Sequence, residues 1–190
     1  MSSPPTIELE PLLAPLPGDV AVGPDLRADD SPTSLYFELR TRRQECRDAE
    51  RQADAGATDG PVSGWAAVLA GCESILREKS KDFEVACWLI EAQVRLNGFA
   101  GLRDGFRLAD GLVSQYWDTL HSITDDSDPT ARGEPLAVLN GKGREGALIA
   151  PIRKIALTPV IPPGPFAYWQ CEQQQRRSQG KDDGQGHRRE

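Results

Sequence analysis

The residues best suited to chemistry surround His121, which is followed within a few residues by an acidic loop, TDDSDP. The loop supplies Asp125, Asp126 and Asp128, and carboxylates are ligands that hard cations prefer. A histidine beside a bound cation would make a metal-dependent hydrolase one interpretation. The loop lacks the glycine and the distal Glu of an EF-hand, and no nucleophile motif accompanies the single histidine of the folded region. We therefore favour a solvated loop whose aspartates cap the following helix, with no metal ligand and no catalytic residue.

Two further patterns could do chemistry, but neither has the required spacing. The four cysteines are widely separated, with no CxxC and no paired histidines: Cys46, Cys72, Cys87 and Cys171. We expect them to be reduced, buried residues of a cytoplasmic protein. Gly141-Lys142-Gly143 lacks the spacing of a phosphate-binding P-loop and follows no strand, so we interpret it as a linker. The sequence predicts no cofactor.

The composition places these motifs in one domain with tails. A chain of 190 residues normally forms a single core. Its 38% hydrophobic and 6% aromatic residues are modest, so we expect the two ends to lie outside that core. A net charge of -7 argues against nucleic-acid binding and favours protein partners. The longest apolar run of the helical region, residues 85–90, is far shorter than the roughly 20 residues that span a membrane, and the start does not resemble a signal peptide.

The chain divides into a Pro-rich N-terminal arm (1–30), a helical domain (31–160) and a mostly disordered polar tail (161–190). The arm has one apolar piece, residues 7–13, suited to a turn of helix. The tail begins with an aromatic island that includes Trp169.

Periodic apolar residues predict the helices on either side of the middle of the domain. The first helix, residues 34–53, has a thin stripe that starts at Leu35, and the next is capped by Ser63 and has one apolar face from Trp65 to Leu76. A later helix, residues 102–120, places Trp117 on its apolar stripe. Two shorter apolar pieces follow: residues 135–139, and residues 147–157, which carry Pro151 and should kink or divide into two short helices.

The middle helix differs from the others in having two apolar stripes. Ser80 is the expected N-cap, Asp82 lies in the first turn, and Asn97-Gly98 is a strong stop signal. One stripe runs from Val85 to Leu96 and the opposite stripe from Phe83 to Val94, so this helix should be buried on two sides. The remaining ribbon consists of Glu84, Glu91 and Arg95, and the last two can pair at i, i+4. The sequence thus predicts an all-α compact bundle of about five or six helices around a central helix.

The first helix carries a basic strip made of Arg42, Arg43, Arg47 and Arg51. Glutamates and aspartates interleave with these arginines, which is typical of an ion-paired surface helix. A protein contact is the alternative. We take as candidate contact residues those that the core does not use: Arg43, Arg47, Arg51, Asp125, Asp126, Asp128 and Trp169.

Several segments together resemble a known family. SKDFEVACWLIEAQVRLNGFAGLRDGFRL, then LVSQYWDTLH, an acidic loop and an Arg-Gly-Glu-Pro-Leu helix are similar to the ImpA-type N-terminal domain of TssA proteins of the type VI secretion system. Upstream, GPDLRADD resembles that family's GxDLR segment. The residues that carry the resemblance are Asp25, Leu26, Arg27, Ser80, Lys81, Asp82, Trp88, Leu89, Gly98, Gly101, Leu102, Trp117 and Asp118. One departure is Ser122, where the family usually has Pro.

The resemblance implies a non-catalytic, cytoplasmic assembly factor that binds baseplate and sheath proteins of the secretion system. Family members normally continue into a second helical region and a C-terminal domain that forms rings. Because that region is missing from these 190 residues, a monomer or weak oligomer, a fragment and a short paralogue are all open. The alternatives in other classes are the metal-dependent hydrolase and a ligand-sensing helical domain, which would need an internal pocket.

Overall fold

The computed structural model describes residues 3–29, 31, 33–56, 64–122, 128–141, 143, 145–158 and 164–185. They form the following elements: α1 (Leu9–Leu13), η1 (Leu26–Ala28), α2 (Leu35–Asp54), α3 (Trp65–Glu78), α4 (Phe83–Tyr116), η2 (Pro129–Gly133), α5 (Glu134–Asn140), α6 (Ile149–Lys154) and α7 (Tyr168–Gln185), where η marks a 3-10 helix. These described residues contain isolated β-bridges but no strand, so the predicted all-α class is confirmed. No helix in the same ranges is both long and apolar enough to cross a bilayer.

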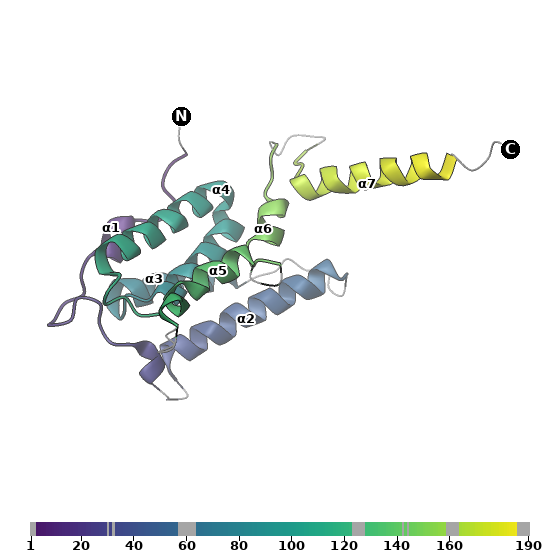
Figure 1. The fold of residues 1–190 in the computed structure, drawn as a ribbon. Coiled ribbons are helices and arrows are strands. Elements are labelled where there is room, and N and C mark those ends of the chain that lie inside the picture. Colours follow the sequence, from purple (N-terminus) through teal and green to yellow (C-terminus); the bar gives the residue numbers. More distant parts are fainter. Residues whose placement is uncertain are drawn as a thin grey trace.

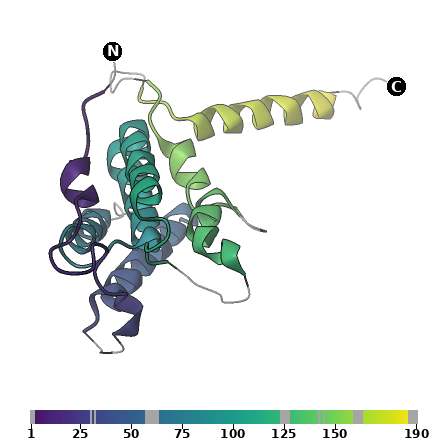
Figure 2. The same cartoon turned by 60° about the vertical axis from the view of Figure 1, so that its left-hand side comes forward.

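Helix α4 is a hairpin of two limbs, residues 83–97 and 99–116, which meet at Gly98. Gly98 has a φ of 56° and a ψ of -135°, a conformation that glycine adopts without a side-chain clash. The limbs then run back along each other so closely that a Cβ atom at Gly101 would lie 2.2 Å from the main-chain oxygen of Gln93. Figures 1 and 2 show α4 folded back on itself within the bundle. The predicted stop at this glycine is confirmed.

The first limb of α4 forms the centre of the core. Nine of its apolar side chains are no more than 2% exposed: Phe83, Val85, Ala86, Cys87, Trp88, Leu89, Ile90, Ala92 and Val94. Burial on two sides is therefore confirmed, with Leu96, 43% exposed, as the exception. The polar ribbon is covered as well, because Glu91 is 0% exposed and Arg95 is largely covered. The helix is enclosed on three sides, one more than the sequence predicts.

Helices α3 and α2 cover this limb in different ways. Helix α3 packs directly on α4 and buries most of its own apolar face, including Trp65 and Val68. Helix α2 lies against α3 and reaches α4 with long side chains. At the start of α2 the buried residue is Tyr36, not the predicted Leu35. The Tyr36 ring packs against Trp88, with the two ring centres 5.2 Å apart. Leu35 is 47% exposed.

The second limb of α4 buries only part of its predicted apolar stripe. Its buried positions are Gly101, Asp104, Gly105, Leu108, Ala109 and Leu112. Ala109 and Leu112 are on that stripe, whereas Phe106 is 41% exposed. Trp117 is 44% exposed, so the prediction that it is a core residue is wrong.

The starts of the central helices also differ from the sequence prediction. Asp82, not Ser80, is the N-cap of α4, since its Oδ1 accepts a hydrogen bond from the Val85 N–H at 3.0 Å. Ser80 is instead buried and used elsewhere. The N-cap position of α3 is Gly64, and the predicted cap Ser63 lies outside the described residues.

The two ends of the chain differ in how they contact the core. The arm packs onto the bundle, and Leu12 of α1 is fully buried. Pro151 lies in the first turn of α6, where its missing N–H breaks no helical bond, so the predicted kink does not occur. The sequence predicts a mostly disordered tail from residue 161, and within this tail the backbone has one helical segment, Tyr168–Gln185. This helix, α7, extends away from the bundle (Figures 1 and 2).

Candidate protein-binding surface

The motif residues before η1 and before α4 bind one another. The Asp25 side chain caps η1 by accepting the Arg27 N–H at 3.0 Å. The Arg27 guanidinium donates to both Asp82 oxygens at 2.5 and 3.1 Å and to Glu84 at 2.9 Å. The Ser80 hydroxyl donates to the main-chain oxygen of Pro24 at 2.7 Å. These side chains fasten the arm to the start of the central helix.

Lys81 fastens the arm at a second point. Its side chain is fully buried, and Nζ donates to the main-chain oxygens of Leu12 at 2.7 Å and Leu76 at 2.6 Å. These carbonyls lie near the C-terminal ends of α1 and α3, where an amine favourably meets the negative end of each helix. Burial lowers the pKa of Lys81 to about 8. The amine therefore joins α1 to α3.

His121 and the acidic loop have structural roles wherever the structure describes them. His121 Nε2 lies 2.9 Å from the Gly23 oxygen, and the His121 main chain pairs with residues 81 and 83. Asp128 caps η2 by accepting hydrogen bonds from the N–H and hydroxyl of Thr130. Asp125 and Asp126 lie outside the described residues. Among those described, no three His, Cys, Asp or Glu side chains are grouped so that they could hold a metal ion.

The thiols of Cys46, Cys72 and Cys87 are buried, as predicted, and burial raises the pKa of each. A thiol with a raised pKa is a poor nucleophile at neutral pH because little thiolate is present. Cys171, on α7, is exposed, so the prediction that all four cysteines are buried is wrong for this one.

The arginines of the basic strip have different surroundings. Arg43 is 12% exposed, binds the buried carboxylate of Glu91, and lies 5.4 Å from the centre of the Trp88 ring. Its side chain therefore connects α2 to α4. Arg51 is 67% exposed and pairs with Asp48. Arg47 is half-buried; no hydrogen bond or ion pair joins it to a described residue, and Glu91 is the carboxylate whose charge acts on it.

A second set of bonds between α2 and α4 centres on Glu50. Its carboxylate accepts a hydrogen bond from the Trp65 indole N–H at 2.8 Å and two from the Arg95 guanidinium at 2.7 and 2.8 Å. The Arg95 guanidinium also lies 4.0 Å from the Trp65 ring centre. This cluster fixes one wall of a groove.

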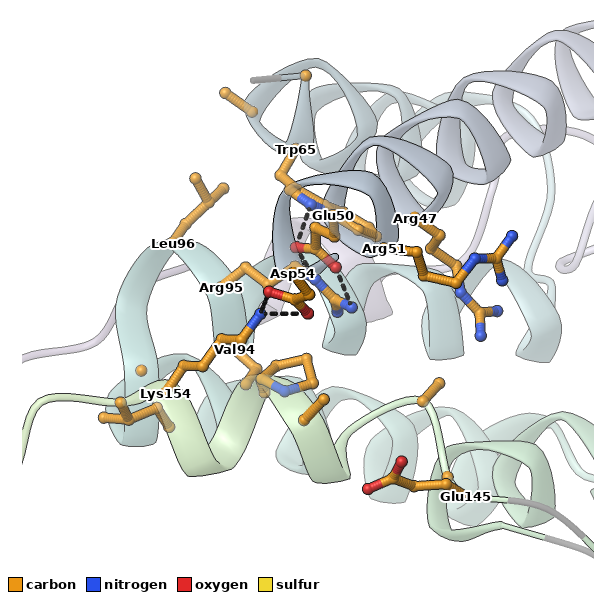
Figure 3. A pocket seen from close by; sticks show the side chains of 18 of the residues that line it. Arg47, Glu50, Arg51, Asp54, Trp65, Val94, Arg95, Leu96, Glu145 and Lys154 are labelled. Carbon is orange, nitrogen blue, oxygen red and sulfur yellow. Dashed lines mark hydrogen bonds and ion pairs between the residues drawn. The ribbon is translucent and has the colours of Figure 1, made fainter. Parts of the chain in front are cut away.

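The groove has a volume of about 970 Å³ and lies between the C-terminal half of α2, the start of α3, the end of the first α4 limb and residues 145–156. Lys154 of α6 crosses it to bind the Asp54 carboxylate at 2.5 and 2.7 Å. Figure 3 shows Leu96 near one end, the Arg47 and Arg51 side chains together toward the other, and Trp65 between them. The groove therefore combines apolar and cationic parts.

The remaining candidate residues lie away from this groove. Trp169 on α7 is 41% exposed and lies beside Tyr168, which lines a smaller recess of about 410 Å³ together with Phe99 and Leu157. Trp117 lies at the end of α4, with the Arg132 guanidinium 5.5 Å from its ring centre. The basic strip in the sequence indicated one wall of the groove, but no sequence signal indicated the apolar wall from α6.

Comparison with known proteins identifies relatives of most of this chain. A family model described as ImpA, N-terminal, type VI secretion system matches residues 13–141. The type VI secretion system component TssA1 of Pseudomonas aeruginosa PAO1 is 34% identical over 129 residues, which are 66% of this chain and 36% of that protein. The chain thus spans about a third of the length of this curated relative.

A solved structure has the same fold. It is the N-terminal domain, including the conserved ImpA_N region, of the TssA component of the type VI secretion system from Burkholderia cenocepacia. The TM-score is 0.72 at 24% identity, over 95% of this chain and 63% of that one.

Proposed function

The chain belongs to the ImpA N-terminal family of the type VI secretion system, and from this premise we propose that it is a non-catalytic scaffold component. It acts by binding baseplate or sheath proteins of that system in the cytoplasm. One observation carries the proposal: the polar residues that resemble the family's motifs are occupied by internal bonds. Arg27, Ser80, Lys81 and Asp82 hold the arm and the central helix together, and a framework of this kind presents its outer surface to partners.

The binding unit comprises more than the predicted helical domain, 31–160. The arm, 1–30, contributes buried side chains, among them Leu12, so we propose that arm and domain act together. Within the tail, α7 extends from this unit and carries Trp169 as a further candidate contact.

Co-purification tests the proposal. The tagged 190-residue chain is co-expressed with single baseplate and sheath subunits of the type VI system from the same genome. We expect at least one subunit to co-elute in a defined ratio on size exclusion, and an unrelated protein with the same tag serves as control. If no baseplate or sheath subunit binds at micromolar concentrations, the proposal is wrong.

Calorimetry tests the alternative enzyme class. We expect titration with Mg²⁺, Mn²⁺ or Zn²⁺ to give no stoichiometric heat, because Asp128 is used in a cap and His121 contacts the arm. Tight binding of one cation per chain would instead favour the metal-dependent hydrolase.

A further inference from the structure

Charges in the groove are nearly balanced by internal pairs, which makes the exception informative. Arg95 is neutralised by Glu50, Lys154 by Asp54, and Arg51 by Asp48. Glu145, on the opposite wall, pairs with Arg153 at 3.4 Å. Each of these charged residues lines the groove or binds a residue that does. Arg47 is the one further charged residue among the lining residues.

Arg47 is the cation of the groove that forms no ion pair with a described residue. It is half-buried, and burial lowers the pKa of its guanidinium. Glu91 opposes this effect, but the neighbouring guanidinium groups of Arg43, Arg95 and Arg51 add to it. Removing a guanidinium from water without supplying an anion costs free energy. A carboxylate placed against Arg47 would recover that cost.

The shape of the groove indicates what carries the carboxylate. Arg47 and Arg51 line the groove, and in Figure 3 their side chains lie together toward one end while Leu96 lies at the other. Leu96 is 43% exposed, so an apolar side chain can be buried against it. A ligand that fits both ends of the groove needs an acidic group for Arg47 and an apolar group for Leu96. A peptide segment can supply both as two of its side chains. A polyanion such as nucleic acid or an anionic membrane is disfavoured by the net charge of -7.

We propose that the groove between α2 and α6 binds a segment of a partner protein by pairing one of its Asp or Glu side chains with Arg47 while an apolar side chain covers Leu96. This inference rests on the proposed function and specifies the chemistry of the partner. A planar guanidinium favours such a pair because it can donate two parallel hydrogen bonds to one carboxylate.

Selection from a random heptapeptide phage library on the immobilised 190-residue chain tests this inference. We expect enriched peptides to carry Asp or Glu together with an apolar residue. Arg47→Ala should weaken their binding about 10- to 100-fold, the effect of losing a charge-assisted hydrogen bond in a partly buried site. Arg47→Lys should restore only part of the affinity. The matched control is Arg42→Ala, which removes an exposed arginine of the same helix that pairs with Glu38.

The outcomes separate the inference from the proposed function. Enriched peptides without an acidic residue, unchanged binding to Arg47→Ala, or no enrichment over that variant would each overturn the groove assignment. A short oligonucleotide that displaces the peptides with similar affinity would also overturn it. A type VI subunit that binds Arg47→Ala as well as wild type would support the function and refute the groove. Because no ion pair joins Arg47 to a residue that the structure describes, its variants should unfold near the wild-type urea concentration, which excludes misfolding as the cause.

Discussion

Replacing Trp88 by Ala is the most direct test of the central helix. The Trp88 side chain is 2% exposed and lies in the first limb of α4. The Tyr36 ring lies 5.2 Å from it on one side, and the Arg43 guanidinium is 5.4 Å from its ring centre. Truncation therefore empties a site in which α2 and α4 meet.

The expected loss follows from these contacts. Removing a large aromatic residue from a packed core costs about 3 to 5 kcal/mol in the free energy of unfolding. The ring pair with Tyr36 adds about 0.5 to 1.5 kcal/mol and the contact with Arg43 about 0.5 to 1 kcal/mol. Both are partly included in the first range, so we expect the upper part of it, about 4 to 5 kcal/mol.

Urea unfolding followed by far-UV circular dichroism measures this loss without depending on the fluorescence of the mutated residue. Trp117→Ala is the matched control, because the same residue type lies 44% exposed at the end of α4 and should cost less than about 2 kcal/mol. Trp88→Phe, which keeps an apolar ring, remains measurable if Trp88→Ala does not fold. A loss below 1 kcal/mol for Trp88→Ala, or equal losses at the two tryptophans, would refute the packing described here.

Three further predictions concern a buried amine, a close helix contact and an exposed thiol. Burial lowers the pKa of Lys81 from 10.5 to about 8, so between these pH values the unfolded chain binds more protons than the folded chain. The stability of wild type relative to Lys81→Met should therefore increase as pH rises from 8 to 10. Urea titrations that show a constant or shrinking difference would contradict this. Gly101→Ala should cost at least about 1 to 3 kcal/mol by overpacking, because its Cβ would meet the Gln93 oxygen at 2.2 Å, whereas Gly133→Ala has open space and should be near neutral in thermal melts. Cys171 should react with a thiol reagent within minutes and the three buried cysteines only on unfolding; four equal rates would exclude the described core.

Local sequence patterns predict the central hairpin well. The two apolar stripes of the first limb and the glycine stop at Gly98 need only helical periodicity and glycine's conformational range. The second limb is harder to predict because part of its inner face is made of small residues such as Gly101 and Gly105, which contribute no hydrophobic signal. Periodicity correctly buries Ala109 and Leu112, but it also places Trp117, which is 44% exposed, in the core.

Caps are ambiguous for a related reason. Ser80 and Asp82 are both good N-cap residues by type, and they lie two positions apart. The choice is made by bonds to distant segments: Ser80 donates to Pro24, and Asp82 binds Arg27. Neither partner is within helical reach in the sequence.

The same limitation explains why the groove could be only partly predicted from the sequence. Arg43, Arg47 and Arg51 are spaced four residues apart, so the sequence presents them as equivalent members of one strip. Their surroundings differ because Arg43 meets Glu91, 48 residues away, and Arg51 meets Asp48 on its own helix. In a bundle held by ion pairs between distant helices, the cation that we propose for partner binding is the one that forms no ion pair with a described residue. A count of charges along α2 gives the number of cations, but only the packing of α2 against α4 separates Arg47 from the other two.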